Sequence, residues 1–171
     1  MSRMFDARAM IAADPIVKTL SGIASGTRIM TMDGEIPVEF LEPGDRIITR
    51  DSGVATLRAI EVTELTDAPM IRVTADSLGL GRPGEDVLLV SGQSILLRDW
   101  RAKALYGQAQ AMVPVSRLVD GQYISHCTVA FARVYALQFD RLHVIYAEGL
   151  ELASAPAVVN APANTPANTP A

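Results

Sequence analysis

The sequence has few of the residues on which metal sites and redox chemistry depend. Among its 171 residues are one cysteine, Cys127, and two histidines, His126 and His143. A single cysteine cannot form an internal disulfide. These three residues also lack metal-ligand spacing, so we expect no metal site and no cofactor. His126 and Cys127 are neighbours, and neighbours on a strand point to opposite faces, so we do not expect His126 to activate the thiol.

Long apolar runs and basic stripes are also missing. No segment reaches the roughly 18 apolar residues that a transmembrane helix needs, and residues 1–20 lack the apolar core of a signal peptide. We therefore expect a cytoplasmic protein by default, with non-classical secretion left open. The net charge is −4 and the Lys and Arg residues are scattered, which argues against a nucleic-acid partner. A protein partner stays open, but the sequence names none.

Proline and charge divide the chain into three parts. Residues 1–20 form a leader in which Ser2–Ala12 has the composition of a short helix that stops before a Pro. Residues 153–171 carry no charge, repeat "PANT" and contain four prolines, so we expect a disordered or polyproline-II-like tail. Residues 21–152 are left for one folded domain.

The central part reads as β structure. Short runs rich in Val, Ile, Leu and Thr are bounded by Gly, Pro, Asp or Ser, which predicts an all-β sandwich or a partly closed barrel. The predicted strands are Arg28–Thr31, Arg46–Arg50, Val54–Glu64, Met70–Thr74, Val87–Val90, Ile95–Arg98, Cys127–Phe139 and Leu142–Ala147. Helical segments are few, and we expect them at Ala102–Tyr106 and Val115–Val119.

Four stretches carry a family resemblance. They are "GIASGTRIMTMDGEIPVEFLEPGDRIITRDSG", "VLLVSGQSILLRDW", "AMVPVSRLVDGQYI" and "VYALQFDRLHVIYAEGL", in this order. Together they resemble the Hint domain, the self-processing module shared by Hedgehog proteins and inteins, and more narrowly the short Hint proteins of alphaproteobacteria. The resemblance implies a flat all-β disc or horseshoe of short strands with pseudo-two-fold character and minor helical segments.

The same resemblance implies a chemistry. In the family, a Cys or Ser at the first residue attacks the carbonyl just before it, and the peptide bond becomes a thioester or ester. Aligned on Gly26-Thr27, the nucleophile position is Gly22, which has no attacking atom. A slip of one residue places Ser21 there, and its hydroxyl is a weaker nucleophile than a thiolate. Thr27 satisfies backbone groups near this turn, with a remnant site role as the alternative.

The supporting residues also depart from the pattern. A Thr and a His from a T-x-x-H block normally polarise the amide and protonate its nitrogen, but here Ser91 and Ser94 occupy these places in "SGQS". In "FDRLH", Leu142 stands where the family often has His. His143 is displaced by one residue, which on a strand moves it to the other face unless a bulge intervenes.

Two functions follow from this comparison. In the first, the domain has lost self-cleavage and serves as a structural or interaction module, because both the nucleophile and the acid are replaced. In the second, it is a weak autoprocessing enzyme that uses Ser21, with help from Ser91 and His143. A splicing role for Asn160 is not expected, because an intein needs Cys, Ser or Thr after the terminal Asn and here Ala161 follows.

Overall fold

The computed structural model describes residues 21–156. It consists mainly of twelve strands: β1 (Ile23–Ala24), β2 (Arg28–Thr31), β3 (Gly34–Pro37), β4 (Arg46–Thr49), β5 (Gly53–Thr56), β6 (Ala59–Val73), β7 (Val87–Leu89), β8 (Ser94–Leu97), β9 (Ala111–Pro114), β10 (Ile124–Gln138), β11 (Val144–Ala147) and β12 (Leu150–Ala153). The predicted helix in residues 2–12 and the "PANT" repeats lie outside the described residues.

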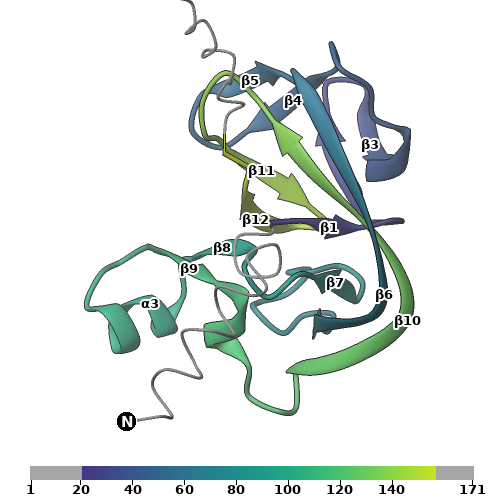
Figure 1. Cartoon of the computed structure of the whole chain (residues 1–171). Coiled ribbons are helices and arrows are strands. Elements are labelled where there is room, and N and C mark those ends of the chain that lie inside the picture. Colours follow the sequence, from purple (N-terminus) through teal and green to yellow (C-terminus); the bar gives the residue numbers. More distant parts are fainter. Residues whose placement is uncertain (1–20, 157–171) are drawn as a thin grey trace, which may run out of the picture.

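Two sheets build the fold (Figure 1). The first closes as a small barrel in the order β1-β10-β6-β7, and the second runs β3-β2-β4-β11-β12-β8-β9, with β5 paired to β4. Helical structure is confined to α3 (Trp100–Tyr106) and the 3₁₀ helices η1 (Val38–Phe40) and η2 (Val115–Leu118). The all-β architecture with few helical segments that the sequence predicted is confirmed.

Two strands are much longer than the sequence predicted. β6 and β10 pair without interruption of register from Ile124↔Val73 to Gln138↔Ala59, and in Figure 1 they curve together along one side of the molecule. The predicted strand Val54–Glu64 is divided between β5 and β6, because buried Leu57 lies between them and bonds back to Asp45. The predicted strand Met70–Thr74 is the far end of β6.

A local distortion in this long pair decides which side chains face inward. Asp67 has a φ of +48°, and its opposite residue Ala130 is skipped in the pairing. On β10, the residues that pack in the small apolar cluster are Cys127 and Val129 before this point and Ala132 and Val134 after it. The parity of the positions that face this cluster therefore changes at the distortion, and both halves of the pair cover it.

An internal repeat explains the pseudo-two-fold character. "SGTRIMT", residues 25–31, and "SGQSILL", residues 91–97, each lead into a strand of the second sheet. β3 and β9 each end in a Pro followed by a buried Val that opens a 3₁₀ helix. The Val38 amide donates to the Thr27 carbonyl at 2.8 Å, and the Val115 amide donates to the Gln93 carbonyl at 2.8 Å.

We name the two equivalent turns the first corner, residues 25–28, and the second corner, residues 91–94. Past each 3₁₀ helix the chain turns at a glycine of positive φ, +103° at Gly44 and +80° at Gly121, where a side chain would be strained. The shared hydrogen bonds show that one backbone unit has been used twice. The two copies therefore differ in their side chains and not in these backbone hydrogen bonds.

The fold extends past Leu152, the predicted end of the domain. Ala153 completes β12, and Ser154 and Ala155 are buried. The Ser154 amide donates to His143 and the Ala155 amide donates to Leu137. Residues 153–155, which the sequence assigned to the tail, are thus part of the fold, because backbone pairing with distant residues holds them.

Candidate functional site

The second corner joins the first described residue to the last strand. The Gln93 side chain is 1% exposed, and its Oε1 accepts a hydrogen bond from Ser21 Oγ at 2.9 Å. Its Nε2 donates to the Ala153 carbonyl at 2.8 Å and to the Ser94 carbonyl at 3.1 Å. One buried amide side chain therefore bridges the segment that enters β1 and the end of β12.

Ser21 and Gly22 face different surroundings. A Cβ atom added at Gly22 would lie 3.2 Å from Val134 Cβ and 3.5 Å from Val90 Cγ2, in the apolar cluster behind β1. The Gly22 carbonyl accepts a hydrogen bond from the Val90 amide at 3.3 Å. Any side chain at position 22 would thus point at valines, whereas the hydroxyl at position 21 points at the Gln93 amide.

His143, not Leu142, faces the interior beside this site. Leu142 is 57% exposed, whereas His143 is 7% exposed. His143 lies directly before β11, where its amide donates to Ser154 Oγ at 3.0 Å and its carbonyl accepts from the Ser154 amide. Because Ser154 follows Ala153, this pairing brings the histidine next to the residue that Gln93 binds.

Asp51 fixes the imidazole of His143. Asp51 Oδ2 lies 2.9 Å from Nδ1, and the other carboxylate oxygen accepts from the Val144 amide at 2.9 Å. Partial burial alone would raise the pKa of Asp51, but the Val144 amide and the imidazole outweigh it and hold that pKa below its usual value. An ionised Asp51 favours the proton on Nδ1, which leaves Nε2 of the neutral ring with the lone pair.

These residues form the candidate site: Ser21, Gln93, Ala153, Ser154 and His143, with Asp51 behind the histidine. It contains two hydroxyls, an amide, an imidazole and a carboxylate, and no thiol. A hydroxyl that donates to an amide oxygen is not activated by it, because an amide oxygen is a very weak base. The arrangement holds the chain at Ser21 in place, but it supplies no base for Ser21 among the contacts of the described residues.

Comparison with known proteins identifies the scaffold. The sequence profile of the Hint domain matches residues 22–157. The chain belongs to the Hint domain family. This is a family of self-splicing domains, and the match covers both corners and both long strands. A search of curated proteins found no match to the sequence.

Solved inteins share the fold of this Hint domain. The bacterial intein-like domain from Clostridium thermocellum is 16% identical, with a TM-score of 0.55, and the similarity covers 79% of this chain and 99% of that domain. A DnaB intein from Synechocystis is 12% identical, with a TM-score of 0.55 and coverage of 78% and 98%. The gp41-1 intein is 9% identical, with a TM-score of 0.53 and coverage of 77% and 97%.

The other predicted site residues of the Hint domain lie apart from Ser21 or use only their backbone. Thr27 is in the first corner, buried, with its carbonyl bonded to Val38. The Ser91 carbonyl accepts from the Ser116 amide, and Ser94 begins β8 opposite Pro114. Among residues 21–156, neither serine hydroxyl makes a side-chain hydrogen bond. Gln93 was not predicted as a site residue, although it occupies the position in the second copy of the repeat that Thr27 occupies in the first.

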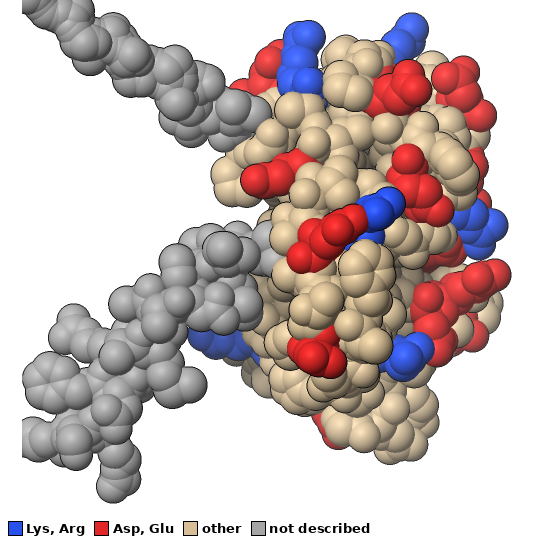
Figure 2. Space-filling model, turned by 45° about the vertical axis from the view of Figure 1, so that its right-hand side comes forward, with Lys and Arg blue, Asp and Glu red and all other residues tan. Residues whose placement is uncertain are grey.

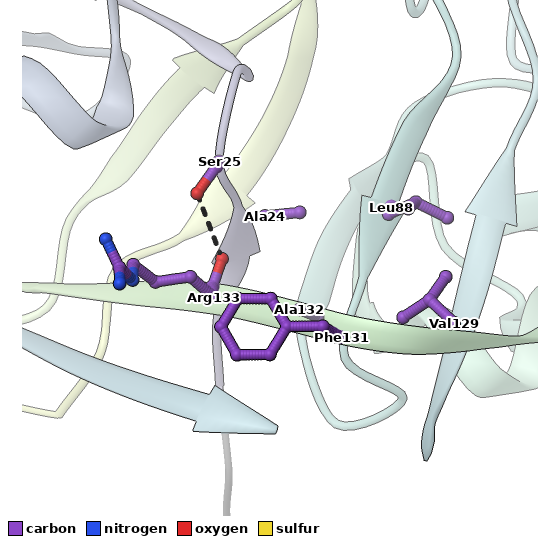
Figure 3. A pocket seen from close by; sticks show the side chains of 7 residues that line it. All are labelled: Ala24, Ser25, Leu88, Val129, Phe131, Ala132 and Arg133. Carbon is purple, nitrogen blue, oxygen red and sulfur yellow. Dashed lines mark hydrogen bonds between the residues drawn. The ribbon is translucent and has the colours of Figure 1, made fainter. Parts of the chain in front are cut away.

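Ser25 of the first corner lies at the edge of a hollow whose lining residues Figure 3 shows. A cavity of about 420 Å³ is lined by Ala24, Ser25, Leu88, Val129, Phe131, Ala132 and Arg133. Ser25 is exposed, and its hydroxyl donates to the Arg133 carbonyl at 3.4 Å. On the side of Ser25, the first corner therefore borders a shallow, mostly apolar hollow.

The remaining predicted groups have no part in the site. His126 is exposed, while Cys127 packs against the small apolar cluster, so the two point to different faces as predicted. Residues 21–156 contain no group of three or more potential ligands that could hold a metal ion. Among the same residues, no helix is long and apolar enough to cross a bilayer. On the face shown in Figure 2, basic and acidic side chains are interspersed.

Proposed function

We propose that this Hint domain has lost self-cleavage and serves as a structural or interaction module for a protein partner. The observation that carries the proposal is the absence of a nucleophile where the family needs one. Gly22 has no side chain, and its Cβ position is closed by Val134. Ser94 stands where the resemblance calls for the histidine that protonates the leaving nitrogen. The order of the four motif blocks also supports placing the chain among the short bacterial Hint proteins.

The chemistry explains why several small departures act together. Cleaving an amide needs an attacking atom about 3–3.5 Å from the carbonyl, donors for the oxyanion and an acid for the departing nitrogen. These groups work as one unit, so the loss of two of them removes far more than a proportional share of the rate. Nothing in the site described above compensates for both losses.

Intact mass of an expressed fusion tests this proposal. We expect a reporter placed upstream of residue 1 to remain covalently attached to the full chain, with and without added thiol. A fusion of the same reporter to an active intein provides the positive control. Release of the reporter with its upstream segment, at Ser21 or Gly22, would contradict the proposal.

Ser21 carries the alternative function, a slow serine-based cleavage. In this reaction Ser21 Oγ attacks the carbonyl carbon of Leu20, the bond from that carbon to the Ser21 nitrogen breaks, and the hydroxyl proton passes to that nitrogen. The product is an ester that water hydrolyses. What supports this alternative is that position 21 keeps a hydroxyl, which buried Gln93 holds in place without activating it. It predicts a product that begins at Ser21 and that the Ser21→Ala variant does not form.

A further inference from the structure

A cluster of three arginines surrounds one buried carboxylate outside the candidate site. Glu151 on β12 is 1% exposed, between Leu150 and Leu152, which both face the core. Its side chain therefore lies on the opposite face of the sheet. There, Arg50 Nη1 lies 3.0 Å from Oε2, Arg82 Nη2 lies 3.1 Å from Oε1, and Arg98 Nε lies 2.6 Å from Oε1.

The three arginines come from separate parts of the chain. Arg50 directly follows β4, Arg98 directly follows β8, and Arg82 lies in the loop between β6 and β7. One carboxylate needs a single well-placed guanidinium to balance its charge, and every further cation adds repulsion. The cluster carries a net charge of about +2. Within residues 21–156, no other carboxylate lies within ion-pair distance of these three guanidinium groups.

The three guanidinium groups also have N–H donors that Glu151 does not use. Each guanidinium has five N–H donors, and one nitrogen of each contacts Glu151. Arg82 Nε is buried and has no hydrogen-bond partner in the described part of the chain. The side chains of Arg50, Arg82 and Arg98 are 33%, 22% and 36% exposed, so an ion can reach them from solvent.

We propose that Arg50, Arg82 and Arg98, held in place by Glu151, bind a tetrahedral dianion of the phosphate class. A charge of about −2 balances the excess, and several oxygens match guanidinium groups that converge from three directions. Glu151 acts as the template: it orients the arginines through one edge and leaves their outer edges for the ligand. Free phosphate and a phosphomonoester share this chemistry.

Thermal unfolding of the full chain tests the site. Inorganic phosphate is titrated against sodium chloride at constant ionic strength, and a ligand that binds only the folded state raises Tm with its concentration. We expect a phosphate-dependent rise in wild-type Tm that chloride does not reproduce. Phosphorus NMR of inorganic phosphate with the folded chain measures the affinity directly. O-phosphoserine in a parallel titration shows whether a monoester binds better than the free ion.

Matched variants separate binding from a general salt effect. Arg98→Gln and Arg82→Gln should each weaken phosphate binding at least tenfold, whereas Arg58→Gln should leave it unchanged, because Arg58 pairs with exposed Asp140. Glu151→Gln should lower Tm without phosphate and also weaken phosphate binding, because the three arginines then lose the carboxylate that orients them. Equal responses in wild type, Arg98→Gln and Arg82→Gln would overturn the proposal, and an unchanged response in Glu151→Gln would overturn the role of Glu151 as the template.

Discussion

The two corners of this Hint domain share a backbone and differ in what their side chains hold. In both, a Ser-Gly pair leads to a buried polar residue, Thr27 or Gln93, whose carbonyl bonds the first residue of a 3₁₀ helix. Thr27 has a short side chain, and its corner opens onto a hollow. Gln93 reaches both Ser21 and Ala153, and its corner is closed. Within residues 21–156, the Gln93 side chain thus joins the two ends of the domain, and the Thr27 side chain makes no such contact.

The residues that follow Thr27 and Gln93 also differ in the contacts of their side chains. Arg28 follows Thr27 and donates from Nε and Nη2 to the two carboxylate oxygens of Glu148, at 2.9 Å each. Ser94 follows Gln93 and occupies the place at which the family resemblance calls for an imidazole. One copy of the repeat is thus fixed by an ion pair to Glu148, and the other by the hydrogen bonds of Gln93 to Ser21 and Ala153.

Removing the Gln93 side chain should have the largest effect on this comparison. The Gln93→Ala variant leaves the Ala153 carbonyl and the Ser21 hydroxyl without their partner and opens a cavity next to β12. We expect a loss of about 2–4 kcal/mol in the free energy of unfolding, measured by urea denaturation. Thr27→Val, the matched change in the first corner, keeps the backbone bond to Val38 and should cost about 1 kcal/mol. Equal losses would show that the two corners are equivalent.

Replacing Glu148 should have an intermediate effect that depends on pH. Burial alone would raise the pKa of Glu148, but the bonds from Arg28 outweigh it and hold that pKa below its ordinary value of 4.5. A carboxylate with a lowered pKa stabilises the fold above its unfolded pKa, and this stability is lost as the pH falls through the folded value. At pH 7, Glu148→Gln should therefore cost about 1–2 kcal/mol.

The difference between wild type and Glu148→Gln should shrink as the pH falls below about 4.5, and urea denaturation at several pH values measures it. Glu35→Gln serves as the control, because Glu35 lies 3.7 Å from the same arginine but is largely exposed. Its effect at pH 7 should be below about 1 kcal/mol. A difference for Glu148→Gln that persists unchanged into acid would mean that the ion pair does not stabilise the first corner.

The sequence revealed the strands whose pattern is local. Arg28–Thr31 was predicted with its observed bounds, and the apolar runs of β7, β8 and β11 were found to within two residues. β12 was missed although Leu150, Glu151 and Leu152 alternate between apolar and charged, because the strand has only four residues and runs into the uncharged segment that the sequence assigned to the tail. Glu151 is buried because three arginines from distant elements surround it, and no local sequence pattern predicts the burial of this carboxylate.

The full length of β6 could not be predicted, because its middle residues are typical of a strand end. Asp67-Ala68-Pro69 has the composition of a strand end, yet β6 continues through it. At Pro69 the strand pairs only with β10, because β7 begins to pair at Ile71, and an edge position tolerates the missing amide hydrogen. Gln93 was overlooked for a related reason: its partners Ser21 and Ala153 lie 72 and 60 residues away, so only the folded chain shows its role.

Restored cleavage should be the smallest effect, and it tests whether the second corner kept its inherited geometry. The family alignment suggests Gly22→Cys with Ser94→His, but a thiol at position 22 would meet Val134, only 3.2 Å from the new Cβ. The side chain at position 21 already faces Gln93. We therefore expect Ser21→Cys with Ser94→His to cleave an upstream reporter faster under added thiol than the Gly22 double variant does. Each single variant should give less product than its double variant, because nucleophile and acid act together.

Mass spectrometry of the released upstream segment distinguishes the two registers. Cleavage through Cys at position 21 gives a fragment that ends at Leu20, whereas cleavage through Cys at position 22 gives one that ends at Ser21. Thiol is added because it intercepts a thioester and prevents its reversal to the amide. Adding Val134→Ala to the Gly22 double variant removes the closest contact of the new Cβ and should raise its yield if packing alone limits it. A Gly22 double variant that cleaves faster than the Ser21 pair would show that the chain before β1 shifts by one residue, and that the bond from Ser21 to Gln93 does not fix the register of the second corner.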